Sequence, residues 1–459
     1  MPSATLIENA SVVTVDPDRR ELTRASVLIE GTTISAIIEA DAPAAPLSDD
    51  VIRIDGSGCV LTPGLVNTHH HLYQWITRGL AADHTLFQWL TTLYPIWAGI
   101  DEQAVHTAAI GGLSTLALSG CTTTTDHHYV FPREGGDLLG AEIGAAQAVG
   151  VRFHPTRGSM DLSEKDGGLP PDTVVQSIDE ILAASSDAVA RWHDPAPDSM
   201  LRIALAPCSP FSVTTDLLRE SAVLARELGV RLHTHLAESV DENTYCDEHF
   251  GCTPLEYMES VGWTGDDVWF AHGIEFADDE IARLAATSTG VAHCPTSNAR
   301  LGNHICRTRD LVDAGVPVGL GVDGAASNES ARLLEEAHQA VLMARTRGGP
   351  TALTTRTAIE LATIGGARVL GRANEIGSIE VGKLADLVLW DLTTLAHADI
   401  DDPVAALVLG AIPPIKASWV NGTQIVADAE LLTVDTATVA ADCAREHRRL
   451  LDKARGALT

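Results

Sequence analysis

Eight short apolar runs alternate with longer amphipathic segments over residues 61–370, and this alternation constrains the fold most strongly. Short apolar runs between turn residues are typical of buried strands, and a period near 3.6 is typical of helices. Eight strands alternating with helices predict α/β architecture with a parallel sheet, and the number favours closure into a (β/α)8 TIM-like barrel. An open doubly wound sheet is the alternative. The expected strands are 61–68, 121–126, 151–156, 202–207, 230–236, 268–272, 290–293 and 317–322.

The segments on either side of this region have a different pattern. Residues 1–60 consist of short β-rich runs separated by turns, and similar runs return over 371–434, where Asn421-Gly422 favours a hairpin. We predict that the two segments form one small composite β-sandwich domain, with the catalytic barrel of residues 61–370 inserted between them. Residues 435–459 are expected to form a closing helix that packs on the rest.

The overall composition excludes several classes of partner. The chain has 62 Asp and Glu against 31 Lys and Arg, for a formal net charge of −31. Such a surface repels phosphate backbones and anionic lipids, so we expect no nucleic-acid or membrane partner. The eight cysteines contain no Cys-x-x-Cys pair, and no signal peptide or long apolar span is evident. We therefore expect a cytoplasmic protein without a disulfide framework.

Histidines cluster where the expected strands end. The first strand runs into His69-His70-His71, and because side chains alternate along a strand, His69 and His71 point the same way. Reactive residues of a (β/α)8 barrel lie at the C-terminal ends of its strands. The other expected strand ends carry Asp126-His127-His128, His154, Cys208, His235, His272, His293 and Asp323. A core histidine satisfied by the backbone would explain any one of these, but not their shared position.

Four of these residues could hold a metal ion. His69, His71, His235 and Asp323 supply three nitrogens and one oxygen, which suits Zn²⁺ or Fe²⁺ with an open position for water. The pattern of His-x-His after strand 1, His after strands 5 and 6, and Asp after strand 8 resembles the amidohydrolase superfamily. Binuclear members of that superfamily carry a carboxylated Lys at the end of strand 4. Cys208 lies in that region here, so the resemblance implies one metal ion, most simply Zn²⁺.

The spacing His235-x-x-Glu238 resembles the cytosine, guanine and adenosine-type deaminases. A metal lowers the pKa of bound water to about 7, and the resulting hydroxide attacks a ring carbon that bears an amino group. The resemblance implies that Glu238 carries a proton to the adjacent ring nitrogen. Asp323 would accept the water proton and deliver it to ammonia, and His272 would stabilise the oxyanion or orient the water. A solvated carboxylate at a helix start is the alternative for Glu238.

Local sequences narrow the resemblance further. Arg157-Gly-Ser-Met160 and the stretches 206–213 and 321–328 are similar to the 8-oxoguanine deaminase group, whose members also accept isocytosine. They resemble less closely the s-triazine hydrolases, such as hydroxyatrazine ethylaminohydrolase. The first resemblance implies conversion of 8-oxoguanine to urate and ammonia. The chain has Thr296 and Ala299 where the 8-oxoguanine group has Cys and Met, so the pocket shape could differ.

Three residues are candidates for binding a small heterocyclic substrate: Gln74, His127 and Cys208. A Gln amide offers both a donor and an acceptor to a lactam edge, although Gln74 could instead be a surface residue at a helix start. Cys208 could equally be a small buried apolar residue. Trp89 and Trp97 are expected to pack in a segment that covers the site.

Two further expectations concern assembly and activity. Oligomers are common among similar enzymes, so a homo-oligomer is compatible with the resemblance. A remote alternative is a non-catalytic amidohydrolase-like binding protein. Such a protein should lack one or more ligands, whereas this chain retains all four together with Glu238 and His272.

Overall fold

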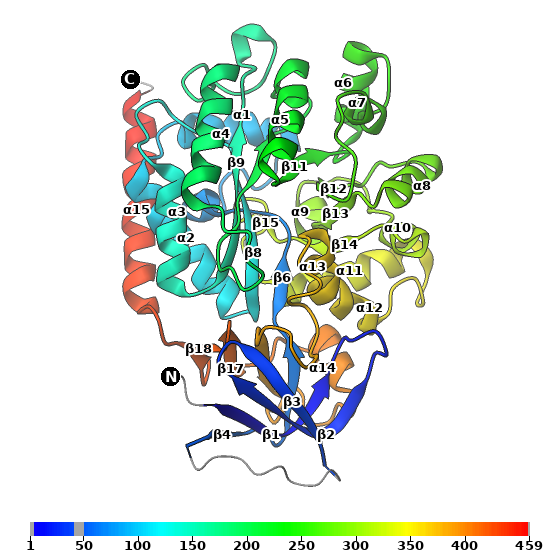
Figure 1. Ribbon diagram of the computed structural model, residues 1–459. Coiled ribbons are helices and arrows are strands. Elements are labelled where there is room, and N and C mark those ends of the chain that lie inside the picture. The colour runs from blue at the N-terminus through cyan, green and yellow to red at the C-terminus, as the bar shows by residue number, and fades with distance from the viewer. Residues whose placement is uncertain (1–3, 41–49, 458–459) are drawn as a thin grey trace.

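The computed structural model describes residues 4–40 and 50–457, and a closed parallel barrel lies at the centre of this part of the chain (Figure 1). The barrel prediction is confirmed. Each barrel strand is flanked by parallel neighbours and buried on both faces, which explains the uninterrupted apolar runs. The barrel strands are β6 (Leu65–Asn67), β8 (Cys121–His128), β9 (Arg152–Ser159), β10 (Ala204–Pro207), β11 (Arg231–Leu236), β12 (Val268–His272), β13 (Gly290–His293) and β14 (Val318–Leu320).

Helices surround the barrel, and their ends follow local capping signals (Figure 1). Helix α5 (Thr215–Leu228), for example, begins where the Thr214 side chain accepts from the Leu217 N–H, and it ends at Gly229 in a left-handed conformation with φ 68°. The other helices of the barrel layer include α2 (Glu102–Ala117), α3 (Leu138–Val149), α4 (Ile178–Trp192), α6 (Val240–Phe250), α7 (Pro254–Ser260), α8 (Asp278–Thr287), α9 (Pro295–Arg300), α10 (Thr308–Ala314), α11 (Leu333–Gly348), α12 (Thr355–Glu360) and α13 (Gly366–Val369).

Strands from both flanking segments form a second sheet below the barrel (Figure 1). In order along the chain they are β1 (Thr5–Val13), β2 (Glu21–Glu30), β3 (Thr33–Glu39), β4 (Ile52–Asp55), β5 (Cys59–Pro63), β16 (Leu387–Asp391), β17 (Ile415–Val420), β18 (Thr423–Ala427) and β19 (Glu430–Leu431). Strand β5 pairs antiparallel with β16, which joins the two segments. The division of the chain at residues 60 and 370 stays a prediction.

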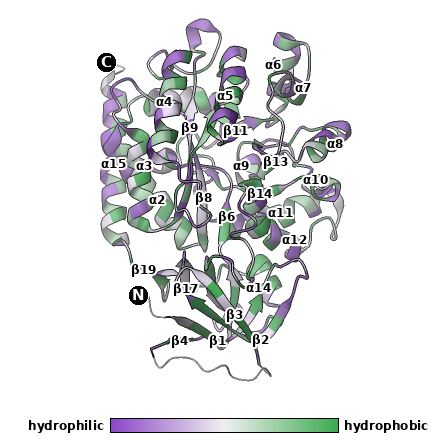
Figure 2. Cartoon of the chain, viewed as in Figure 1, coloured by the Kyte–Doolittle hydropathy of each residue, from purple (hydrophilic) through white to green (hydrophobic). Residues whose placement is uncertain are grey.

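This sheet folds over its own apolar core. The Ile34 N–H near the start of β3 donates to the Lys383 carbonyl at 2.9 Å, which brings one edge of the sheet against the segment leading into β16. The core between them contains Ile7, Val27, Leu61 and Trp419, all at most 2% exposed. Figure 2 shows hydrophobic residues along these strands. The sandwich expected from the sequence is therefore one continuous sheet that encloses a separate core.

The expected strand 61–68 is corrected to two strands that belong to different sheets. Strand β5 ends at Pro63 and β6 begins at Leu65, because the Gly64 N–H donates to the Asp386 carbonyl while the Leu65 N–H donates to the Gly120 carbonyl. A Cβ at Gly64 would lie 2.1 Å from Thr122 Oγ1, so only glycine fits between the two layers. Pro63-Gly64 thus marks the boundary between the sheet and the barrel.

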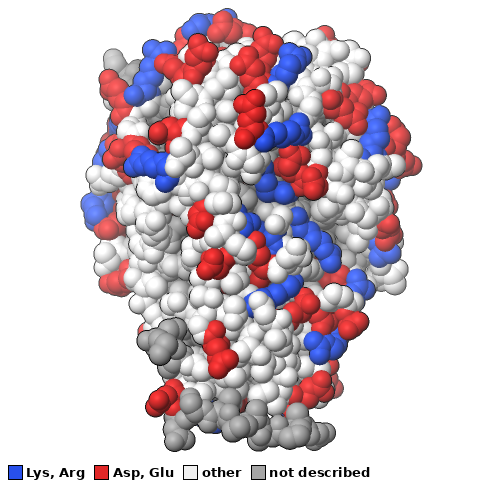
Figure 3. All heavy atoms as spheres, in the orientation of Figure 1, with Lys and Arg blue, Asp and Glu red and all other residues white. Residues whose placement is uncertain are grey.

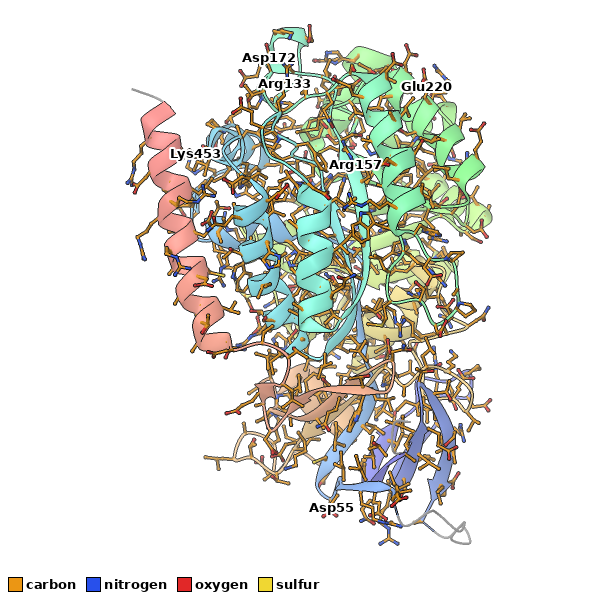
Figure 4. The ribbon with its side chains drawn as sticks, turned by 60° about the vertical axis from the view of Figure 1, so that its left-hand side comes forward. Asp55, Arg133, Arg157, Asp172, Glu220 and Lys453 are labelled. Carbon is orange, nitrogen blue, oxygen red and sulfur yellow. The ribbon has the colours of Figure 1, made fainter. Side chains whose placement is uncertain are left out.

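The C-terminal helix α15 (Thr436–Ala457) packs along one side of the barrel (Figure 1). Its His447 Nδ1 donates to the Ile76 carbonyl at 2.7 Å, and Arg449 pairs with Asp101 at 2.6 Å. Lys453, labelled in Figure 4, donates to the Gly99 carbonyl. These contacts attach the helix to the segment that follows the His-x-His motif.

On the face shown in Figure 3, Asp and Glu are interspersed with Lys and Arg, and several Lys and Arg gather near its centre. In the described part of the chain, no helix combines the length and the apolar character that a membrane span requires.

Candidate metal centre and active site

The four predicted metal ligands meet at the C-terminal end of the barrel. His69 follows β6, His71 lies in β7 (His70–His71), His235 lies in β11, and Asp323 begins β15 (Asp323–Gly324), which pairs with β7. His71 Nε2 lies 3.1 Å from His235 Nε2, and Asp323 Oδ1 lies 3.2 Å from the Nε2 atoms of both His69 and His71. All four residues are at most 9% exposed. The structure therefore brings together a set of residues that are distant in the sequence.

Backbone carbonyls determine the protonation of two of these rings. His71 Nδ1 lies 2.7 Å from the His127 carbonyl, and His235 Nδ1 lies 2.6 Å from the Cys208 carbonyl. A carbonyl only accepts, so each Nδ1 carries the proton in the neutral ring. The Nε2 atoms of His71 and His235 then carry lone pairs that face one another.

His69 has the same arrangement through a neighbouring histidine. His233 Nδ1 donates to the Trp269 carbonyl at 2.9 Å, which leaves His233 Nε2 as an acceptor. His69 Nδ1 lies 2.8 Å from this nitrogen and donates to it. The His69 Nε2 lone pair is thereby directed toward Asp323, and no hydrogen-bond donor from the described part of the chain reaches it.

This donor set fits a divalent metal ion. Lone pairs of buried imidazoles held 3.1 Å apart repel each other, and a cation between them converts the repulsion into coordination. The ligand atoms of His69, His235, His272 and Asp323 all lie within 4.8 Å of one another. The second oxygen of Asp323 accepts from the hydroxyls of Ser297 at 2.5 Å and Ser327 at 3.2 Å, which leaves Oδ1 toward the histidines.

Cys208 directly follows β10, in the region where the sequence resemblance would place a bridging Lys. Burial raises the pKa of its thiol to about 12, so the sulfur stays protonated at neutral pH. Its Sγ lies 3.9 Å from His235 Nδ1, on the side of the ring that faces away from the other ligands. The arrangement around these residues fits a single ion.

Two ionisable groups stand beside the ligands. Glu238 Oε2 lies 3.5 Å from His272 Nε2, and Asn303 donates to Glu238 Oε1 at 3.2 Å. Burial raises the pKa of Glu238, and the charge of Asp323 raises it further against the opposing effect of His272. Burial disfavours charge on His272, but Glu238 and Asp323 outweigh it and raise the pKa of that ring. The pair can thus hold and exchange a proton next to the candidate metal site.

The loop that carries Glu238 is fixed from behind by Glu242. The Glu242 carboxylate in α6 accepts from the backbone N–H groups of both Ala237, at 3.0 Å, and Glu238, at 2.9 Å. Ala237, His272 and Asp323 all adopt left-handed backbone conformations, with φ of 53°, 74° and 60°. Such conformations are unfavourable for residues other than glycine and are concentrated at functional sites. Here they direct side chains into the site.

A cavity opens onto these groups. Its floor is formed by His71, His235, Glu238, His272 and Asp323, and its walls are formed by Gln74, Leu86, Trp89, Leu90, Tyr94, Tyr129, Cys208, Ser209, Phe211, Leu301 and Ser327. The walls are therefore rich in aromatic and aliphatic groups. Among the residues that the structure describes, neither the oxygen nor the nitrogen of the buried Gln74 amide has a hydrogen-bond partner. An unpaired amide in such a cavity is available to a polar ligand.

The other predicted site residues fall in different places. Gln74 and Cys208 line the cavity, whereas His127 lies behind the ligands, with its Nε2 donating to the Ala206 carbonyl at 2.9 Å. His154 is the third residue of β9, which continues to Ser159, so its expected place at the strand end is corrected. Trp97 is fully buried, while Trp89 lines the cavity.

Helix α1 (Leu86–Trp97) was not expected as a helix, yet it supplies one wall of the cavity. Pro95 lies inside it and obscures the pattern, because proline is unfavourable in helix interiors. The spacing of Leu86, Trp89, Leu90, Leu93, Tyr94 and Trp97 is the signal that identifies it. Tyr129, Phe211 and Asn303 lie in connecting segments and had no comparable signal.

Known proteins share this architecture. The model of the Amidohydrolase family matches residues 60–426. The chain is 44% identical to an 8-oxoguanine deaminase from Pseudomonas aeruginosa over 90% of this chain and 92% of that protein. It is 38% identical to a hydroxydechloroatrazine ethylaminohydrolase from Pseudomonas sp. over 86% and 83% of the two chains.

Among solved structures, an atrazine chlorohydrolase from Arthrobacter aurescens complexed with zinc superposes with a TM-score of 0.92 at 31% identity. It covers 96% of this chain and 100% of that one. A zinc-complexed structure of the same architecture agrees with the donor set described above, and both support a divalent metal ion. The chain belongs to the amidohydrolase family.

Proposed function

We propose that this enzyme is a zinc-dependent deaminase of aminated nitrogen heterocycles, with 8-oxoguanine as its preferred substrate and urate and ammonia as its products. The observation that carries the proposal is the unpaired Gln74 amide, which shares one cavity with Glu238 and three of the four candidate ligands, His71, His235 and Asp323. The similarity to an 8-oxoguanine deaminase supports the choice of substrate. A cytoplasmic location and a homo-oligomeric state stay expectations from the sequence.

The candidate ligands would hold one ion. When bound, the metal lowers the pKa of water to about 7 and supplies a hydroxide nucleophile at neutral pH. The Asp323 carboxylate accepts the proton that this water loses, while the hydroxyls of Ser297 and Ser327 stabilise the aspartate. Zinc is proposed because a solved relative of this architecture contains it.

Glu238 carries the second proton. As the C–O bond forms at the amino-bearing carbon, the adjacent ring nitrogen becomes basic, and the Glu238 carboxyl donates a proton to it. The raised pKa of Glu238 favours this role, because a group that donates must hold its proton near neutral pH. His272, 3.5 Å away, stabilises the carboxylate that remains and the developing oxyanion. Proton transfer from Asp323 to the amine then releases ammonia. The remaining hydroxyl proton passes to Glu238 as the C=O bond forms, which restores both carboxyl groups.

Gln74 would select the heterocycle. A lactam edge presents one N–H and one C=O side by side, which matches the acceptor and donor of a Gln side chain. The aromatic walls, with Trp89, Tyr94 and Phe211, suit a planar ring.

A second candidate activity is hydrolysis of alkylated s-triazines. Leu86, Leu90 and Leu301 also line the cavity, and aliphatic walls would accommodate N-alkyl groups. The similarity to the hydroxydechloroatrazine ethylaminohydrolase supports this alternative. A non-catalytic binding role is disfavoured, because every candidate ligand and proton carrier is present.

A panel assay distinguishes these activities. Zinc-loaded protein is assayed for ammonia release from 8-oxoguanine, guanine, isocytosine, cytosine and ammeline, and for amine release from N-alkyl aminotriazines. We expect the highest kcat/KM for 8-oxoguanine, with urate as product. Preference for the alkylated triazines would replace the first proposal with the second, and no turnover of any compound would contradict both.

A further inference from the structure

A second cavity, of about 230 Å³, lies at the end of the barrel opposite the candidate metal site. Its wall includes Arg231, the first residue of β11, and Ile203, which immediately precedes β10, so it lies at the N-terminal ends of these strands. Its ionisable lining residues are His154, His193, Arg202 and Arg231, and all four are basic. This is unusual in a chain with a formal net charge of −31. We refer to it as the barrel-floor cavity.

The positive charges around this cavity exceed the negative ones. Arg202 and Arg372 pair with the same carboxylate, that of Glu375, at 2.7 Å and 2.6 Å. Arg231 donates to two backbone carbonyls, those of Asp266 and Val369. Within the residues that the structure describes, it forms no ion pair with a carboxylate. Two guanidinium groups therefore share one carboxylate, and the third has no paired carboxylate among the described residues.

Several donors at the cavity lack an acceptor. Among the described residues, the Nε atoms of Arg202 and Arg231 are buried and unpartnered. Nδ1 of His154, a residue only 2% exposed, also has no partner there and donates in the tautomer that carries its proton on this nitrogen. His193 Nδ1 accepts from the Ile203 N–H at 3.1 Å, so its proton is on Nε2, which can donate. A buried donor without a partner is costly, and an oxyanion, which has only acceptors, would satisfy all of these groups.

The cavity is also connected to the metal ligands through the barrel interior. The Trp269 ring lies 5.9 Å from the Arg231 guanidinium carbon and 6.0 Å from the His154 ring. The His233 ring stacks on Trp269 at 4.4 Å, and His233 Nε2 accepts from His69 Nδ1. Two lining residues of the barrel-floor cavity, Arg231 and His154, therefore lie beside the tryptophan that supports the candidate metal ligands.

We propose that the barrel-floor cavity is an oxyanion site that binds a phosphate group through Arg202, Arg231, His154 and His193. Several donor-bearing residues that line one cavity, with guanidinium groups among them, suit a tetrahedral oxyanion. The phosphate can be inorganic phosphate or the phosphate of a nucleotide, since both present the same acceptors. This site does not depend on the identity of the heterocycle processed at the other end of the barrel.

Calorimetric titration of the zinc-loaded protein tests the proposal. Inorganic phosphate and a nucleoside monophosphate are compared at constant ionic strength maintained with chloride. We expect saturable binding, weakened roughly tenfold or more by Arg202→Gln and by Arg231→Gln, because each removes a charge-assisted hydrogen bond. Arg219→Gln removes the same charge from an exposed position on α5, where Arg219 pairs with Asp216, and should leave binding unchanged.

The two ligands distinguish the source of the phosphate: saturation by inorganic phosphate identifies the free ion, and saturation only by the nucleotide identifies a larger ligand. Phosphate bound at the zinc ion would be insensitive to the two cavity substitutions, so equal affinity in all variants would overturn the proposal. Absence of saturable binding of either ligand would also overturn it. Arg202→Lys retains the charge and should weaken binding less than Arg202→Gln, which separates ligand contact from a folding defect.

Discussion

His71 Nε2 and His235 Nε2 lie 3.1 Å apart at the C-terminal end of the barrel, while the opposite nitrogen of each ring donates to a backbone carbonyl. Each of the two facing Nε2 atoms therefore carries a lone pair. Rotation of either ring would break its hydrogen bond to the carbonyl. The pair is therefore preorganised to bind a cation.

Removal of the metal should inactivate and destabilise the enzyme. Chelation leaves the lone pairs of His71 and His235 unscreened in a buried site, and the stabilisation from ligand binding is lost. At a free metal concentration about a hundredfold above the dissociation constant, this stabilisation is about 2.7 kcal/mol. Thermal unfolding before and after chelation measures it, and added Zn²⁺ should restore both Tm and activity. An unchanged Tm would contradict a metal held by these residues.

Glu238→Gln should retain the metal and lose turnover. The amide keeps the size of the side chain but cannot donate the carboxyl proton, and general acid catalysis contributes about 10²- to 10⁴-fold. Metal content by elemental analysis, together with kcat for ammonia release, provides the check. If kcat fell by only a few-fold with metal fully bound, Glu238 would not be the proton carrier.

Gln74→Ala should lower kcat/KM by about 10- to 100-fold without loss of metal, because the amide contacts substrate rather than the ion. Gln88→Ala is a matched control on the exposed side of α1, where Gln88 caps the helix by accepting from the Thr85 N–H. Steady-state kinetics on both variants tests the difference. Equal effects of the two substitutions would argue against recognition by Gln74.

The Glu242 carboxyl should make stability depend on pH. Burial raises its pKa from 4.5 to about 7, so the folded protein binds this proton more tightly than the unfolded chain. The associated stabilisation is complete below about pH 4.5 and is lost as the pH rises to about 7. At 1.36 kcal/mol per pKa unit the loss is at most about 3 kcal/mol.

Glu242→Gln does not titrate, so the difference in unfolding free energy between the natural protein and this variant should shrink as the pH rises through that window. Urea unfolding of the two metal-free proteins at several pH values gives this difference. Parallel stability curves would show that Glu242 does not titrate in the folded state over this range.

The barrel could be predicted because its strands are buried on both faces and therefore give continuous apolar runs. The ends of the strands are harder to predict from the sequence. The boundary at Gly64 depends on two hydrogen bonds to different sheets, and the continuation of β9 to Ser159 places His154 near the barrel floor. Neither of these features can be predicted from the local sequence.

The candidate site can likewise be predicted from the sequence only in part. Parallel strands end at one rim of the barrel, which brings together His69, His71, His235 and Asp323. This rule can be applied to a sequence without knowledge of the structure. The position of His127 depends on which way its ring turns, and it turns toward the Ala206 carbonyl. The walls of the cavity come from loops and from α1, whose placement is determined by tertiary packing.

The central claim is that one divalent metal ion in this site drives deamination. The most direct measurement is kcat for ammonia release from 8-oxoguanine as a function of zinc bound per chain, starting from metal-free protein. We predict that activity rises in proportion to zinc, reaches its maximum at one ion per chain and then stays constant. No ammonia at full occupancy, or activity that continues to rise toward two ions per chain, would contradict the account.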